Sequence, residues 1–130
     1  MISITRKQFE KFVHDGITAI PEKFRAKIKH VTFVVEDEPT AEQLEENDIP
    51  KGETLLGLFE GVTLGEEKSG PWNLPPRIVI FKKPAEKYAE TVEEIKKTVR
   101  DTVWHEVAHY LGMEEHEVMR AEERRAGKSS

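Results

Sequence analysis

The segment "HEVAHYLGMEEH", residues 105–116, contains three of the chain's five histidines. His105 and His109 are four residues apart, so in an α-helix their imidazoles share one face and can bind the same metal ion. Glu106 follows His105 directly. In this H-E-x-x-H spacing two neutral histidines bind zinc, and the glutamate takes a proton from water activated by the metal.

A helix predicted over residues 91–111 carries this motif, with an apolar stripe along one side. At roughly 100° per residue, Glu106 lies about 20° from Val99, inside that stripe. A carboxylate directed at the core is unfavourable unless a metal, a proton or a hydrogen bond satisfies it. The alternative is that His105 and His109 lie at the helix surface or core edge, and that Glu106 pairs with a Lys or Arg. The stripe consists of Val92, Ile95, Val99 and Val103.

Gly112 is placed to end this helix in the left-handed conformation. Acidic and histidine residues follow at once, among them Glu115 and His116, and a sharp turn would bring them back toward the ion. This context favours a metal site over a surface helix. The chain has no cysteine, which excludes a thiolate ligand and a cysteine nucleophile.

The remaining segments predict a small domain of helices and strands. A helix is expected over residues 5–20 with Thr5 as its N-cap, and Pro21 closes or restarts it. The order is helix, three strands, helix, helix, which predicts an α/β layer protein with a meander or mixed sheet. The strands are expected in residues 27–37, 53–64 and 77–84. Gly57 and Gly61 interrupt the second strand, and Pro84 ends the third. One helical turn is expected at 40–46 and a last short helix at 114–126.

Four segments, in this order, resemble the minimal zincin-like metallopeptidases: "FVVEDEPT", "GETLLGLFEGVTL", "LPPRIVIFKKP" and "TVWHEVAHYLGMEE". The resemblance implies a minimal zincin-like fold of the α/β (α+β) class. A mixed sheet of about three to four strands would pack against helices, with the active-site helix near the C-terminus. It also implies that His105 and His109 are zinc ligands and that Glu106 is the general base.

The third ligand is implied by the family pattern HExxHxxGxxD, in which it lies three residues after the glycine. That position is Glu115 here, which keeps the register and the charge of the aspartate. His116 is the alternative, since imidazole is a common zinc ligand but would need a turn one residue longer. Glu115 is preferred because the turn at Gly112 sets the direction of the next side chains.

Length and charge narrow the remaining possibilities. The 130 residues predict a single domain, 1–130, with a short disordered tail from about 127. The net charge of −5 comes from interspersed charges without a basic block, which argues against nucleic-acid binding. Neither a signal peptide nor a run of about 20 apolar residues is present, so a soluble, cytoplasmic protein without a membrane partner is expected.

These observations predict a zinc metallopeptidase with one Zn²⁺ ion that hydrolyses a peptide or protein substrate. The segment "LLGLFEG" would either pair with an extended substrate or only form a bulge at its glycines. A homodimer or a partner protein would complete the cleft of so small a domain. The alternative function is a non-catalytic metal-binding interaction module, in which zinc is structural or the site is vestigial.

Overall fold

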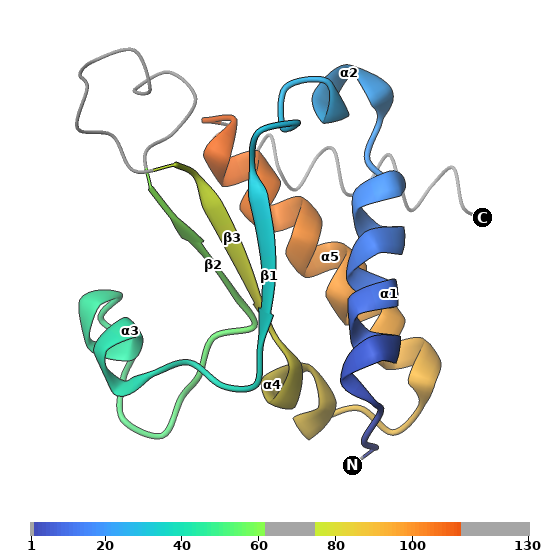
Figure 1. The fold of residues 1–130 in the computed structure, drawn as a ribbon. Helices are drawn as coiled ribbons and strands as arrows, with labels where there is room; N and C mark the ends of the chain where they lie inside the picture. The colour runs from blue at the N-terminus through green and yellow to red at the C-terminus, as the bar shows by residue number, and fades with distance from the viewer. Residues whose placement is uncertain (1, 62–74, 113–130) are drawn as a thin grey trace.

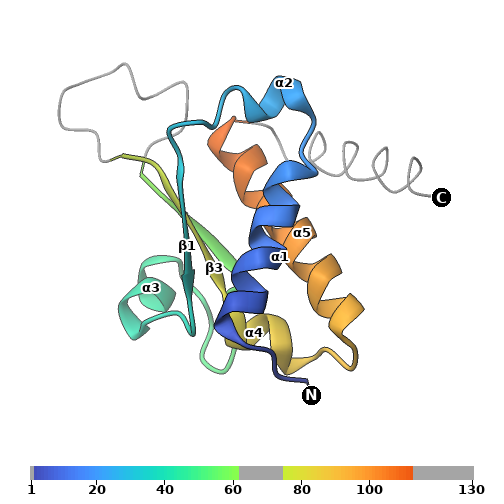
Figure 2. The ribbon, with the colours of Figure 1, turned by 45° about the vertical axis from the view of Figure 1, so that its right-hand side comes forward.

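Two long helices cover one face of a small sheet in the computed structural model, which describes residues 2–61 and 75–112 (Figure 1). Helix α1 spans Arg6–Thr18 and helix α5 spans Val92–Tyr110. They pack side by side, and α5 lies directly against two of the strands (Figure 2). The predicted helix at 5–20 is confirmed, including Thr5, whose side chain and that of Gln8 form a capping box.

The sheet has three strands among the described residues: β1 (Thr32–Glu36), β2 (Gly57–Glu60) and β3 (Arg77–Phe81). Their order is β1-β3-β2, with β1 parallel and β2 antiparallel to β3. The sheet is therefore mixed, as one of the two predictions had it, and it is not a meander. Because β3 is central, β2 forms one edge of the sheet. Strand β2 is also in contact with helix α5.

Three short helices complete the described fold: α2 (Glu22–Arg25), α3 (Ala41–Glu46) and α4 (Lys82–Lys87). Helix α2 shows that Pro21 restarts the chain as a helix, and α3 confirms the helical turn expected at 40–46. Helix α4 was not predicted. Pro84 was expected to stop the third strand, but that strand ends at Phe81 and Pro84 lies in the first turn of α4. Proline is tolerated there because its missing N–H needs no partner.

Helix α5 is anchored at its start and along its buried side. The Thr91 side chain caps it by accepting a hydrogen bond of 3.1 Å from the Glu94 N–H. Ile95, Val99 and Val103 of the predicted stripe are fully buried, whereas Val92 is partly exposed. Each fully buried aliphatic side chain contributes about 1.5–3 kcal/mol, so packing holds the helix in one rotation about its axis. That rotation directs residues 102 and 106 at β2.

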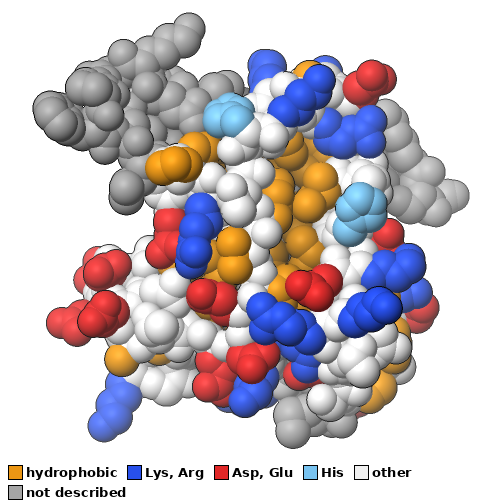
Figure 3. Space-filling view, viewed as in Figure 1, with side chains coloured by type: hydrophobic (Ala, Val, Ile, Leu, Met, Phe, Trp, Pro, Cys, Tyr) orange, Lys and Arg blue, Asp and Glu red, His pale blue; other side chains and the backbone are white. Residues whose placement is uncertain are grey.

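The surface in the view of Figure 1 carries both signs of charge (Figure 3). Acidic side chains gather over α3, where Glu42, Glu45 and Glu46 are exposed. Within residues 2–61 and 75–112, none of the helices combines the length and the apolar character that crossing a membrane requires. The segments predicted as a helix at 114–126 and as a tail from 127 lie outside the described residues.

Candidate metal centre

The last turns of α5 bring the H-E-x-x-H side chains together. The ring centroids of His105 and His109 are 4.2 Å apart, with an angle of 65° between the ring planes. One donor atom from each of His105, Glu106 and His109 lies within 4.8 Å of the other two. Of the residues that the structure describes, these three form the only such group of potential ligands. Two imidazoles and a carboxylate are ligand types that zinc accepts.

Glu106 is buried on the strand-facing side of α5, as its place in the apolar stripe predicted. Its side chain is 12% exposed, while that of His109 is 41% exposed. The carboxylate Oε1 lies 3.7 Å from His109 Nδ1. The motif therefore combines an imidazole open to solvent with a carboxylate sheltered behind it.

Burial is the main influence on the charge of this carboxylate. It raises the pKa of Glu106 above its ordinary value, and the charge of a protonated His109 and a hydrogen bond from the Phe59 N–H offset only part of that rise. A divalent cation held by the two imidazoles would favour the charged form. The buried carboxylate and the donor set thus both fit a metal at this position.

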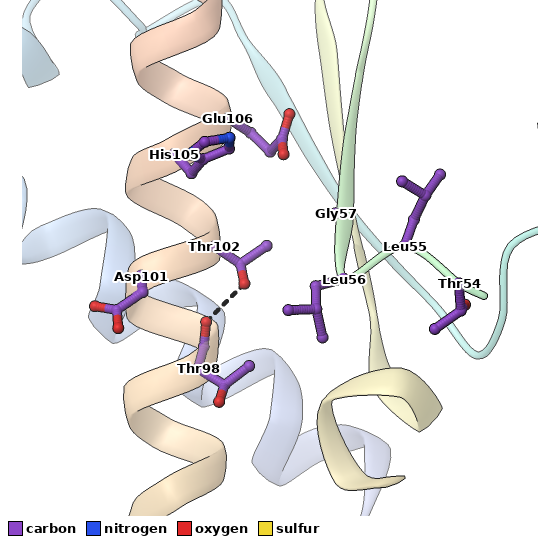
Figure 4. Close-up of a pocket in the computed structure, with 9 residues that line it drawn as sticks. All are labelled: Thr54, Leu55, Leu56, Gly57, Thr98, Asp101, Thr102, His105 and Glu106. Carbon is purple, nitrogen blue, oxygen red and sulfur yellow. Dashed lines mark hydrogen bonds between the residues drawn. The ribbon is translucent and has the colours of Figure 1, made fainter. Parts of the chain in front are cut away.

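A pocket of about 460 Å³ opens between α5 and the residues that lead into β2. Glu106 and Thr102 point across it toward the strand, whereas Asp101 points away from the strand (Figure 4). An exposed leucine, Leu56, stands opposite the helix. The pocket gives a small molecule or a peptide segment access to the motif. It is lined by Thr54, Leu55, Leu56, Gly57, Thr98, Asp101, Thr102, His105 and Glu106.

The helix ends as the sequence predicted. Its last residue is Tyr110, and Gly112 has φ +80°, the left-handed conformation that glycine adopts without strain. The Gly112 N–H donates to the His109 carbonyl over 3.0 Å. Both candidates for the third ligand, Glu115 and His116, lie outside the described residues, so the choice between them stays a prediction.

The two remaining histidines of the described residues, His14 and His30, do not belong to this group of potential ligands. His14 is exposed on α1. His30 is also exposed, but its Nε2 is 2.6 Å from the hydroxyl of Tyr110, the residue after His109. The sequence analysis missed this contact and the hydrogen bond from Phe59 to Glu106. Neither had a signal in the sequence, because one joins residues 80 positions apart and the other uses a backbone N–H that nearly every residue has.

Comparison with known proteins agrees with this geometry. A sequence profile described as "zincin-like metallopeptidase" matches residues 28–125, which include β1 to β3 and the whole H-E-x-x-H motif. No curated protein matched the chain.

Among solved structures, the chain is similar to a conserved hypothetical protein from Thermus thermophilus, with a TM-score of 0.56 and 18% identity. The match covers 83% of this chain and 94% of that one, and at this identity it supports the fold alone. The profile spans more than half of the sequence and includes the candidate metal centre. The chain therefore belongs to the zincin-like metallopeptidase family.

Proposed function

We propose that this protein is a zinc-dependent metallopeptidase in which His105 and His109 bind one Zn²⁺ ion and Glu106 is the general base. The observation that carries the proposal is the convergence of two imidazoles and a buried carboxylate at the end of α5, where His105 and Glu106 line a pocket. Zinc bound there would polarise the scissile carbonyl and lower the pKa of the attacking water. Glu115 is the third ligand in this proposal, with His116 as the alternative.

Glu106 has the surroundings that a general base needs. Its side chain is 12% exposed and its oxygen lies within 4.8 Å of the imidazole donor atoms, so it is placed to accept a proton from water at the ion. It takes a proton from the attacking water at a carboxylate oxygen and passes it to the leaving amine. Its shelter from bulk water helps to keep that proton at the site until the amine departs.

The β2 edge offers a place for an extended substrate. The Phe81 N–H donates to the Leu56 carbonyl over 3.0 Å, so backbone groups of alternate residues from Leu56 onward face β3. The groups of Gly57 and Phe59 therefore face away from β3. A peptide added along this side would run past the pocket. Because the Phe59 N–H already donates to Glu106, strand addition would use the Gly57 N–H and the carbonyls of Gly57 and Phe59. We propose a peptide or protein substrate, with a second copy or a partner protein completing the cleft.

Hydrolysis of a mixed peptide library by the zinc-loaded protein tests the proposal. We expect Glu106→Gln to lower hydrolysis by about 10²- to 10⁴-fold while zinc stays bound, because the amide cannot accept the proton. Glu93→Gln, in the exposed first turn of the same helix, is the matched control and should leave hydrolysis unchanged. Equal rates for Glu106→Gln and the wild type would show that Glu106 is not the base.

A further inference from the structure

Gly57 is the first residue of β2 and packs against helix α5. A Cβ at this position would lie 2.6 Å from Thr102 Cγ2 and 3.3 Å from Glu106 Cγ. It would also lie 3.3 Å from the Val79 carbonyl oxygen on the neighbouring strand. Gly57 is not among the residues with positive φ, so the backbone conformation itself would accept alanine. What the position lacks is space for a side chain.

The orientation of Thr102 makes this contact specific. Its hydroxyl donates to the Thr98 carbonyl over 2.7 Å, one turn back along α5. With the hydroxyl held there, the Cγ2 methyl faces Gly57 (Figure 4). Thr102 and Glu106 are four residues apart and therefore adjacent on the same helix face. The strand backbone passes over both of them.

We propose that Gly57 is a positioning residue for Glu106. Because Gly57 has no side chain, strand β2 packs closely on helix α5, and this close packing keeps the Glu106 carboxylate beside the two histidines. The proposal rests on the proposed function, in which Glu106 is the general base. A methyl group at position 57 would force Thr102 to move and would press on Glu106 Cγ, so the carboxylate would shift from its place beside the histidines. The hydrogen bond from Phe59, two residues further along the same edge, supports a strand that orients this carboxylate.

Three variants test whether Gly57 positions Glu106 or is only required for the strand to fold. Gly57→Ala introduces the clash with both side chains. Gly57→Ala with Thr102→Ser removes the Cγ2 methyl that lies 2.6 Å away and leaves the longer contact, 3.3 Å, with Glu106 Cγ. Gly57→Ala with Thr102→Val keeps a branched methyl at that place and is the matched control. Thr102→Ser and Thr102→Val alone serve as their references.

Each variant is measured for peptide hydrolysis, for zinc affinity and, in the zinc-free protein, for the nuclear Overhauser contact between position 57 and Glu106 Hγ. We expect Gly57→Ala to lower hydrolysis by about tenfold or more, as small displacements of reacting groups do. Zinc affinity should change by less than about threefold, because both histidines stay on the same helix. Thr102→Ser should return hydrolysis to within about twofold of its own reference, and Thr102→Val should not.

The contact with Glu106 Hγ should weaken in Gly57→Ala and return only in the serine double variant. Unchanged hydrolysis in Gly57→Ala, equal recovery with serine and valine, or a parallel loss of zinc affinity would each overturn the proposal. If Gly57→Ala does not fold, the two double variants decide the question, and failure of the serine variant to fold or to regain the contact counts against it. If the wild type hydrolyses no peptide, the proposed function fails, but the nuclear Overhauser contacts still test the positioning role.

Discussion

The imidazoles of His105 and His109 lie 4.2 Å apart on successive turns of α5, and neither ring depends on a loop for its position. The helix that carries them is held by Trp104, Val107 and Ala108, which are fully buried. Two ligands on such a rigid element lose little conformational entropy when a metal binds. The pair is therefore preorganised for the metal ion that we propose it binds.

The third ligand can be identified by comparing two neighbouring residues. We expect Glu115→Ala to lower zinc affinity at least about tenfold, because a ligand is lost, and His116→Ala to leave it nearly unchanged. Competition with a chromogenic chelator measures both. The reverse pattern would assign the third ligand to His116. Equal losses would mean four protein ligands, which is typical of a closed structural site and would favour the non-catalytic module.

Glu86 should make the stability of the protein sensitive to acid. Its Oε2 accepts hydrogen bonds from the Ile4 N–H over 2.7 Å and from Lys82 Nζ over 2.9 Å. Burial alone would raise the pKa of Glu86, but these hydrogen bonds and the charge of Lys82 together lower it below the ordinary value. A lowered pKa stabilises the fold above the unfolded-state pKa, and this stabilisation is lost as the pH falls through the folded-state pKa.

We therefore expect Glu86→Gln to lower the free energy of unfolding by about 1–3 kcal/mol at pH 7. The difference from the wild type should shrink as the pH falls. Urea unfolding at several pH values measures it, with Glu90→Gln, an exposed glutamate just beyond α4, as the control. If the difference in the free energy of unfolding between wild type and Glu86→Gln stays constant down to the most acidic pH at which both proteins fold, Glu86 does not stabilise the fold through its charge.

Tyr110 and His30 should stabilise the protein as a pair. The Tyr110 side chain is fully buried and its hydroxyl lies 2.6 Å from His30 Nε2, linking the end of α5 to the residues before β1. Tyr110→Phe removes the hydroxyl and keeps the ring, so we expect a loss of about 0.5–1.5 kcal/mol. A double-mutant cycle with His30→Ala should show that the two losses are not additive. Additive losses would mean that the contact contributes nothing to stability.

Local patterns carried most of what the sequence predicted correctly. The cap at Thr5, the buried stripe of α5 and the turn at Gly112 each depend on residues a few positions apart. The spacing of His105 and His109 is local as well, and so is the burial of Glu106 once the helix face is known. Periodicity and glycine chemistry are sufficient for such features.

The features that the sequence did not predict depend on contacts between distant segments. Placing β3 between β1 and β2 is a choice of pairing that hydrophobic patterns do not encode. Gly57 was predicted to interrupt the second strand, but its neighbours Thr102 and Glu106 are known only from the fold. The second strand begins at Gly57 and not at residue 53, and helix α4 follows β3 directly; both depend on tertiary packing that overrides local preference.

Calorimetric titration of the metal-free protein with zinc measures whether α5 binds this ion through His105 and His109. We expect the wild type to bind one equivalent, and His105→Ala and His109→Ala each to lose at least about tenfold in affinity. His14→Ala, an exposed histidine on α1, should bind like the wild type. A wild type that binds no zinc, or one whose affinity is unaffected by either histidine substitution, would show that His105 and His109 do not form a zinc site.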